Sequence, residues 1–167
     1  MRVLVTGGAG YVGSHALRAL RSRGHEALVF DNLSRGHRRA VLDASFVQGD
    51  LLDPEALERA FAGRGMEAVI HFAALAYVGE SVEKPDLYYR NNVVGTLNLL
   101  DAMRRHALGK LIFSSTCATY GDPIMPRMEE SHPQNPVNPY GRSKLLTEWA
   151  LRDYEAAFGM RSVALRY

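Results

Sequence analysis

Short apolar runs alternate with longer segments of helical period along the whole chain. The runs are nearly continuous in apolar residues, which is typical of strands that are covered on both faces. Six of them predict strands, at residues 2–6, 26–30, 44–48, 67–73, 110–115 and 160–167. Helical periods predict helices near residues 12–23, 54–62, 85–106 and 139–158. This alternation predicts βαβ units and an α/β fold with a doubly wound parallel sheet and helices on both faces.

Turn and capping residues define the two ends of the predicted helix near 54–62, whereas one long segment has no predicted helix or strand. Asp53 can cap the helix that begins at Pro54, and Gly63 can end it. Residues 117–138 are rich in proline and polar residues and show no period, which predicts a long functional loop. Right-handed crossovers place the carboxyl ends of all strands at one edge of the sheet, where ligands of such folds bind.

Length and charge favour an ordinary globular domain. The 167 residues fit one domain over residues 1–167, and the formal net charge is +2. This balance argues against a nucleic-acid partner, although Arg35–Arg39 ("RGHRR") form a local basic cluster, which we interpret as a solvated loop.

The cysteine and histidine content excludes several site types. Cys117 is the only cysteine, so no internal disulfide can form, and a reducing cytoplasm is the expected location. No apolar stretch is long enough for a signal peptide or a membrane span. The six histidines show no metal-ligand spacing, so we expect no metal. His71 and Cys117 are both expected to be packed side chains at strand ends.

A glycine-rich turn follows the first predicted strand. Gly7, Gly10 and Gly13 form a G-x-x-G-x-x-G pattern that opens a helix, which is typical of the Rossmann turn that receives a pyrophosphate. Asp31 ends the second strand, where its carboxylate can bind the adenosine ribose and repel a 2′-phosphate. The pattern therefore predicts NAD rather than NADP, with Arg35 as the residue that argues for NADP.

The stretch "NPYGRSK" (138–144) holds a candidate acid/base pair. Tyr140 and Lys144 are four residues apart and share one face of a helix that Asn138 can cap and Pro139 can open. A tyrosine has a pKa of about 10, and a nearby ammonium would lower it toward neutral pH. The pair becomes specific because it follows a dinucleotide turn and the hydroxyl-rich strand end "FSSTCATYG" (113–121).

These motifs together resemble the extended short-chain dehydrogenase/reductases. Finer matches are similar to the UDP-glucose 4-epimerases of that family: "TGGAGYVGSH", "DNLSRG", "HFAA", "VGES", "YYRNNVVGTLNLL" and "SSTCATYGD". They run through the whole chain but correspond to the N-terminal half of the family, so the resemblance implies that the C-terminal substrate domain is absent from this sequence.

The resemblance also implies a role for each matching residue. It implies that Thr116, Tyr140 and Lys144 are catalytic, with Tyr140 as the base. It implies cofactor contacts for Gly7, Gly10, Tyr11, Val12, Gly13, Asp31, Asn32, Asp50, Leu51, Phe72, Ala73, Ala74, Asn91, Ser114, Tyr140 and Lys144. One departure is Ala76, where some members have a cofactor-contacting lysine.

The activity implied is interconversion of UDP-glucose and UDP-galactose by NAD-dependent oxidation and reduction at sugar C4. Another nucleotide-sugar epimerase or decarboxylase, or an NAD-binding domain without turnover, stays open. A 4,6-dehydratase is disfavoured because Cys117 and Ala118 stand where that class has an Asp-Glu pair. The family also implies a homodimer through the helices near 85–106 and 139–158.

Overall fold

The structure, a computed structural model, describes all of residues 1–167. Its centre is a six-stranded sheet in the order β3-β2-β1-β4-β5-β6, and every neighbouring pair of strands is parallel. The strands are β1 (Arg2–Thr6), β2 (Glu26–Asp31), β3 (Ser45–Gln48), β4 (Ala68–His71), β5 (Lys110–Ser114) and β6 (Arg161–Leu165). The predicted doubly wound parallel sheet is confirmed.

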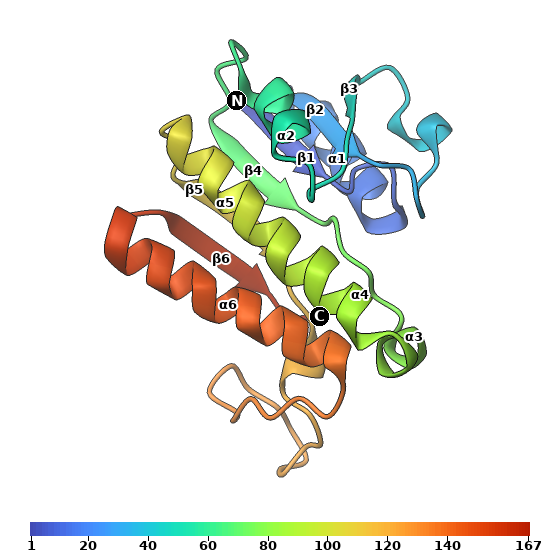
Figure 1. Cartoon of the computed structure of the whole chain (residues 1–167), viewed down its shortest axis with the longest axis vertical. Helices are drawn as coiled ribbons and strands as arrows, with labels where there is room; N and C mark the ends of the chain where they lie inside the picture. Colours follow the sequence, from blue (N-terminus) through green and yellow to red (C-terminus); the bar gives the residue numbers. More distant parts are fainter.

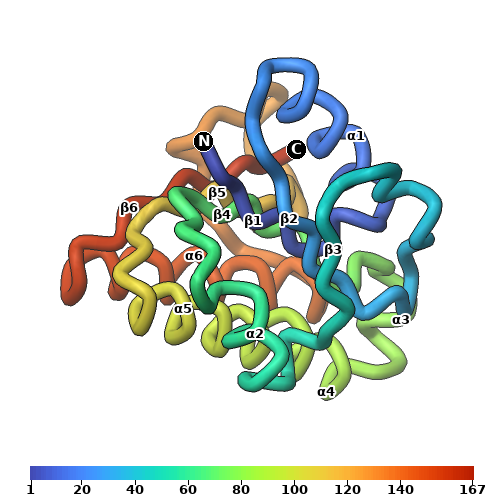
Figure 2. The backbone as a smooth tube through the Cα atoms, turned by 90° about the horizontal axis from the view of Figure 1, so that it is seen from above, coloured from blue at the N-terminus to red at the C-terminus, as the bar shows by residue number.

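Helices cover the two faces of the sheet unequally (Figures 1 and 2). On one face lie α2 (Pro54–Phe61), α5 (Gly95–Arg105) and α6 (Pro139–Phe158). The opposite face carries α1 (Tyr11–Ser22), which packs over β1 and β2, and the short 3-10 helix η1 (Arg38–Val41), which contacts α1. The predicted helices on both faces are therefore confirmed, with the larger layer on the α5 side.

The core follows this division. A cluster of 18 buried residues, including Leu57, Leu100 and Leu151, fills the space between the sheet and α2, α5 and α6. A smaller cluster around Leu17 and Val29 lies under α1. Burial of such aliphatic side chains contributes roughly 1.5–3 kcal/mol each, so the larger layer carries most of the stabilisation.

One part of the sheet has no helix over it. Parallel register places Val29, Val5, Ile70, Ile112 and Val163 in one row across five strands. Val29 and Val5 are fully buried at the α1 end of the row, whereas Ile112 is 39% exposed and Val163 56% exposed. The outer face of β5 and β6 is therefore an open apolar surface.

The local boundaries follow from capping chemistry. Asp53 accepts hydrogen bonds from the backbone N–H groups of Glu55 (3.0 Å) and Ala56 (3.2 Å), which fixes the start of α2 as predicted. Asn138 likewise accepts from the N–H of Gly141 (2.8 Å) and caps α6, with Pro139 in its first turn. Both predictions of a capped helix start are confirmed.

The predicted helix near 85–106 is correct in extent but not regular. It consists of α4 (Pro85–Tyr88), a π-helical segment η2 (Tyr89–Val94) and α5. A further helix, α3 (Val78–Glu83), precedes it and was not predicted. The long loop after β5 is confirmed: apart from the 3-10 helix η3 (Cys117–Thr119), residues 117–138 have no regular element, and they project beyond the sheet in Figure 1.

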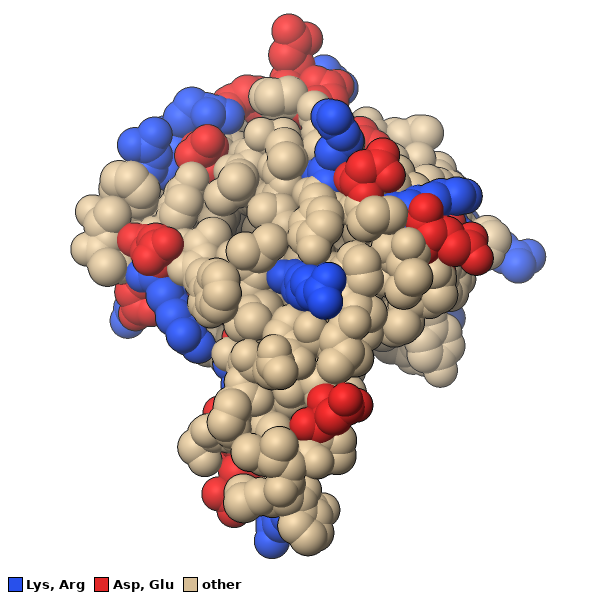
Figure 3. Space-filling model, turned by 60° about the horizontal axis from the view of Figure 1, so that its bottom comes forward, with Lys and Arg blue, Asp and Glu red and all other residues tan.

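The surface carries charges of both signs. In Figure 3 the basic and acidic side chains are interspersed, and no extended region of a single sign appears on that face. No helix of this chain is both long enough and apolar enough to cross a membrane.

Candidate functional site

Two adjoining cavities lie at the carboxyl ends of the strands. The first, of about 110 Å³, is bordered by the ends of β2 and β3 and by η2. The second, of about 370 Å³, extends from the glycine turn to α6. They share six lining residues, namely Gly7, Gly10, Arg35, Phe72, Ala74 and Leu75. The two cavities therefore form one groove across the middle of the sheet edge.

The glycine turn forms the floor where the two cavities meet. Gly7 has a φ of +70°, and a Cβ there would lie 2.5 Å from the backbone nitrogen of Ala73. A Cβ on Gly13 would collide with the carbonyl oxygen of Gly7. Both positions thus require glycine, one for conformation and close approach, the other for contact between α1 and the turn.

The same turn presents unpaired backbone donors. Gly10 is the N-cap of α1, and no side chain caps the helix N-terminus by a hydrogen bond. Tyr11, Val12 and Gly13 line the second cavity at this point. Free N–H groups and the positive end of the helix dipole make the turn suitable for a phosphate anion.

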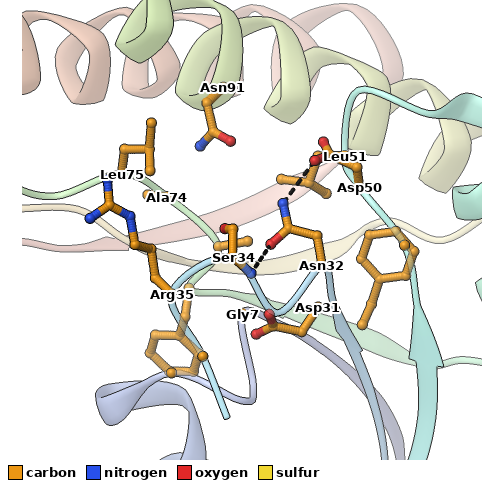
Figure 4. A pocket seen from close by; sticks show the side chains of 16 residues that line it. Gly7, Asp31, Asn32, Ser34, Arg35, Asp50, Leu51, Ala74, Leu75 and Asn91 are labelled. Atoms are coloured by element: carbon orange, nitrogen blue, oxygen red, sulfur yellow. Dashed lines mark hydrogen bonds between the residues drawn. The ribbon is translucent and has the colours of Figure 1, made fainter. Parts of the chain in front are cut away.

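The polar residues of the first cavity hold one another in place (Figure 4). Asp31 accepts hydrogen bonds from the N–H groups of Ala9 (3.0 Å) and Leu33 (2.8 Å), which joins the end of β2 to the glycine turn. Asn32 donates to Asp50 Oδ2 at 2.7 Å. Each carboxylate keeps acceptor capacity beyond these bonds. The cavity is thus a preformed recess with hydrogen-bond acceptors for a hydroxyl-rich ligand.

The π-helical segment supplies the side of the groove opposite Asp31. Asn91 lines the first cavity, as Figure 4 shows. Its neighbour Asn92 is buried, accepts from the Leu75 N–H (2.9 Å), and donates to the Leu75 carbonyl (3.0 Å) and to Ser143 Oγ (3.0 Å). Asn92 therefore fixes the segment after β4 to the groove, a role that sequence reasoning missed.

Tyr140 and Lys144 both line the second cavity, together with Ser114. Lys144 is 3% exposed, and its Nζ donates to the Ser114 carbonyl at 2.8 Å and lies 4.7 Å from the centre of the Phe113 ring. Burial lowers the pKa of Lys144 to about 7. A lysine that titrates near neutral pH is characteristic of a functional position.

The pKa of Tyr140 differs from the sequence-based expectation. Burial raises it, and the hydroxyl of Thr116, which offers the phenol a hydrogen bond, opposes this rise. Burial therefore outweighs any lowering of this pKa by Lys144 in the chain by itself. A tyrosine in such surroundings is a proton donor unless a positive charge is placed against it.

Thr116 is not one of the residues that line the two cavities. It is 6% exposed, and its hydroxyl accepts the N–H of Ala118 at 3.1 Å, which starts η3. The neighbouring Cys117 is exposed, which corrects the expectation that it packs against the core. His71 is buried as expected: it hydrogen-bonds Thr6 (2.6 Å) and Thr96 (2.9 Å), and burial lowers its pKa to about 3.

A buried ion pair supports this end of the groove. Glu148 lies one helical turn after Lys144 and pairs with Arg166 at 2.6 Å, the two side chains being 2% and 16% exposed. Burial raises the pKa of Glu148, but hydrogen bonds from Arg166, Ser115 and Gln134 lower it more, so it stays below the ordinary value. These contacts join α6, the end of β5 and the loop after it.

Tyr167 is a further cavity residue that sequence reasoning missed. Its hydroxyl hydrogen-bonds Ser114 Oγ at 2.6 Å, and its carbonyl accepts the N–H of Cys117 at 3.2 Å. Arg35, which the sequence places in a solvated loop, also lines the groove and pairs with Glu80 at 2.8 Å. Both contacts join segments that are far apart in the sequence.

The chain is similar to known proteins along its whole length. Residues 3–167 match the "NAD dependent epimerase/dehydratase family". The UDP-glucose 4-epimerase of Corynebacterium glutamicum is 49% identical over 100% of this chain and 50% of its own length. The chain spans about half the length of the curated relatives it matches.

Solved structures agree with the sequence relatives. A UDP-glucose 4-epimerase from Brucella ovis in complex with NAD is 54% identical, with a TM-score of 0.97 over 99% of this chain and 51% of that one. The UDP-glucose 4-epimerase of Thermus thermophilus in complex with NAD is 46% identical, with a TM-score of 0.97 over 100% of this chain and 55% of that one.

Proposed function

The chain belongs to the NAD dependent epimerase/dehydratase family, and on that premise we propose that it binds NAD along the groove and takes part in epimerisation of a UDP-hexose at C4. The observation that carries the proposal is the continuity of the groove: a glycine turn with free N–H donors lies between an acceptor-lined recess and a cavity with Tyr140 and Lys144. A dinucleotide has the same three parts, with its diphosphate in the middle.

The residues present fit this cofactor. The first cavity, with Asp31, Asn32, Asp50, Leu51 and Asn91, would hold the adenosine, and the turn would hold the diphosphate. Phe72, Ala73 and Ala74 would pass beneath its middle, because they leave the end of β4 directly under the turn. The carboxylate of Asp31 favours NAD, since a 2′-phosphate beside it would be repelled.

The second cavity would hold the reacting end. NAD, when bound, supplies an acceptor and donor of hydride, and the protein supplies orientation and proton transfer. Tyr140 would take the proton of the sugar 4-hydroxyl on its phenolate oxygen and return it later, with Thr116 as its hydrogen-bond partner. Lys144 donates to the Ser114 carbonyl, and its protonated amine would stabilise the phenolate of Tyr140.

We propose a homodimer through the exposed faces of α4, η2 and α6. These elements pack together and carry Leu87, Val94, Leu146 and Trp149, which are 38–50% exposed. Large apolar side chains grouped on adjoining helices favour an interface. Light scattering at micromolar concentration should give twice the chain mass, and Trp149→Lys should give the monomer. A monomer for the unchanged chain would contradict the proposed dimer.

The single cysteine supports the cytoplasmic location expected from the sequence.

The function is tested on the purified protein. Fluorescence and mass spectrometry would show whether NAD is retained, and absorbance at 340 nm would then be followed after UDP-galactose is added. We expect bound or readily bound NAD, and an absorbance increase that Tyr140→Phe abolishes while NAD binding persists. Failure to bind NAD would contradict the proposal. Binding without any absorbance change would instead favour an NAD-binding unit without turnover.

A further inference from the structure

His132 is a buried histidine in the long loop between β5 and α6. It is 5% exposed, whereas residues 122–131 immediately before it are all exposed. Its imidazole packs against Tyr120, with 5.6 Å between the ring centres and 83° between the ring planes. It lines neither cavity of the groove, and the loop projects beyond the sheet in Figure 1. His132 is therefore a buried ionisable group that the proposed function does not use.

Both ring nitrogens of His132 are hydrogen-bonded to the backbone. Nδ1 lies 2.8 Å from the carbonyl oxygen of Pro133, and Nε2 accepts the N–H of Ile124 at 3.2 Å. A carbonyl oxygen can only accept, so Nδ1 carries the hydrogen, and the lone pair that Ile124 needs is on Nε2. The two bonds together require the neutral imidazole with its proton on Nδ1. The loop is therefore closed by one protonation state of this side chain.

Bonds to His132 are most of what holds the segment 122–131, which we call the outer loop. The outer loop makes three hydrogen bonds with the rest of the chain, and two of them go to the Nε2 and the backbone N–H of His132. The third is a long bond from Arg166 Nη1 to a backbone carbonyl, at 3.4 Å. The residues after His132 are anchored separately, since Gln134 donates to Glu148 at 3.0 Å. The outer loop can therefore open while α6 stays in place.

The charged groups around His132 do not favour a second positive charge there. The guanidinium of Arg166 lies 5.2 Å from the centre of the same Tyr120 ring and donates to its hydroxyl at 2.9 Å. The carboxylate of Glu148 is already paired with Arg166 at 2.6 Å. The charged residues of the outer loop are exposed, and none forms an ion pair with the imidazole: Asp122, Arg127, Glu129 and Glu130. The closed loop therefore offers the charged imidazole a nearby cation and no paired carboxylate.

We propose that His132 is a pH-sensitive switch that holds the outer loop closed when it is neutral and releases it when it is protonated. Protonation places a second N–H on Nε2, opposite the N–H of Ile124, so that two donors face each other and the bond is lost. The open loop accepts the proton without that loss. It therefore binds protons more readily than the closed loop, and opening becomes more favourable as pH falls. Histidine changes charge between pH 5 and 8, so the release is expected in that range.

The test measures by NMR how strongly the Ile124 N–H is protected from hydrogen exchange, relative to its intrinsic exchange rate at each pH between 8 and 5. We expect protection to fall with pH, by at most about tenfold per pH unit and by at least about fivefold in total. The Gly141 N–H, which Asn138 binds, should keep its protection within about twofold, because the opening is local. Trypsin gives a second readout, since Arg127 is the only lysine or arginine in residues 111–141. Its cleavage, relative to a free peptide of the same sequence, should accelerate by a similar factor.

Two variants separate His132 from the other groups that titrate. His132→Gln cannot change charge, so its Ile124 protection and its cleavage by trypsin should vary with pH by less than about twofold. His106→Gln is the matched control, because His106 pairs with Glu58 at 2.7 Å outside the loop and should leave the full fall in place.

Several results would overturn the inference. One is a constant protection of Ile124 between pH 8 and 5, and another is the same fall in His132→Gln. A joint loss of protection at Ile124 and Gly141 would show that acid unfolds the domain rather than the outer loop. Absence of protection at pH 8 would show that the outer loop is not held at all. None of these results affects the proposed function, because the measurements need neither NAD nor a sugar.

Discussion

The two ends of the groove are formed by different kinds of chemical group. At the Asp31 end, backbone geometry decides the shape, and the polar side chains are held by short local hydrogen bonds such as those that Asp31 accepts from Ala9 and Leu33. At the Tyr140 end, ionisable side chains are buried, and the pKa values of Tyr140 and Lys144 are shifted in opposite directions. The first end is suited to binding and the second to proton transfer.

The difference also affects stability. Local hydrogen bonds around a glycine turn are compatible with a stable fold, whereas a buried lysine destabilises it whenever the lysine is charged. The ion pair of Glu148 with Arg166 lies next to Lys144 and links three segments of the chain there. Four substitutions test this contrast, and they follow in order of decreasing expected effect.

Glu148→Gln should have the largest effect, at the Tyr140 end. It leaves the nearly buried guanidinium of Arg166 without its counter-charge, which destabilises proteins by about 3–5 kcal/mol. The measurement is the free energy of unfolding in urea. The control is Glu58→Gln, whose partners Arg105 and His106 are on the surface, and which should lose no more than about 1 kcal/mol. Equal losses would show that the buried pair is not special.

Gly7→Ala should have the next largest effect, at the turn. The new Cβ meets the Ala73 backbone in addition to the strain of a positive φ, so we expect a loss of about 3 kcal/mol and no measurable NAD binding. Gly24→Ala is the control, because Gly24 has a similar φ of +76° and open space around it. It should lose only about 1 kcal/mol. A small loss at Gly7 would mean that the turn can rearrange.

Lys144→Met tests the pH dependence that is particular to the Tyr140 end. The pKa of Lys144 is lowered to about 7 in the folded chain, whereas an unfolded lysine titrates near 10.4. Between these two pKa values the unfolded state binds more protons than the folded state, so the free energy of unfolding rises by about 1.4 kcal/mol per pH unit. Below about pH 7, Lys144 is charged in both states and destabilises the fold by its full amount. Lys144→Met should remove that rise. An unchanged slope in urea unfolding between pH 7 and 10 would contradict the lowered pKa.

Asp31→Asn should have the smallest effect on the fold and a selective one on binding. The amide oxygen can keep the hydrogen bond from the Leu33 N–H, but the bond from the Ala9 N–H and the negative charge are lost. We expect NAD to bind about tenfold more weakly and the preference for NAD over NADP to shrink by a similar factor. Competition titrations with both cofactors measure this. A preference that stays unchanged would mean that Asp31 does not select the cofactor.

The sequence predicted the fold and much of the groove because both depend on local signals. Each of these signals is contained in a short stretch of sequence: the apolar strands, the Gly7–Gly13 pattern, and the caps Asp53 and Asn138. The predicted end of β4 was too late because Phe72 and Ala73 leave the sheet to pass beneath the turn. Hydrophobic periodicity does not distinguish a chain in the sheet from one that has just left it.

The contacts that the sequence did not predict are those between distant segments. Arg166 reaches Glu148, Tyr167 reaches Ser114, and Arg35 reaches Glu80 across 45 positions. The π-helical segment was also missed, because one extra residue in a turn changes hydrogen bonding without changing composition. Burial likewise sets the pKa of Lys144, and burial is known only once the chain is folded.

Calorimetric titration with NAD and with ADP-ribose, which lacks the nicotinamide, most directly tests whether one dinucleotide spans both ends of the groove. The unchanged chain should bind both with one site per chain. Lys144→Met should weaken NAD while leaving ADP-ribose within about twofold, and Asp31→Asn should weaken both. If the Lys144 variant binds NAD unchanged, or loses both ligands equally while it remains folded, the Tyr140 end is not where the nicotinamide lies.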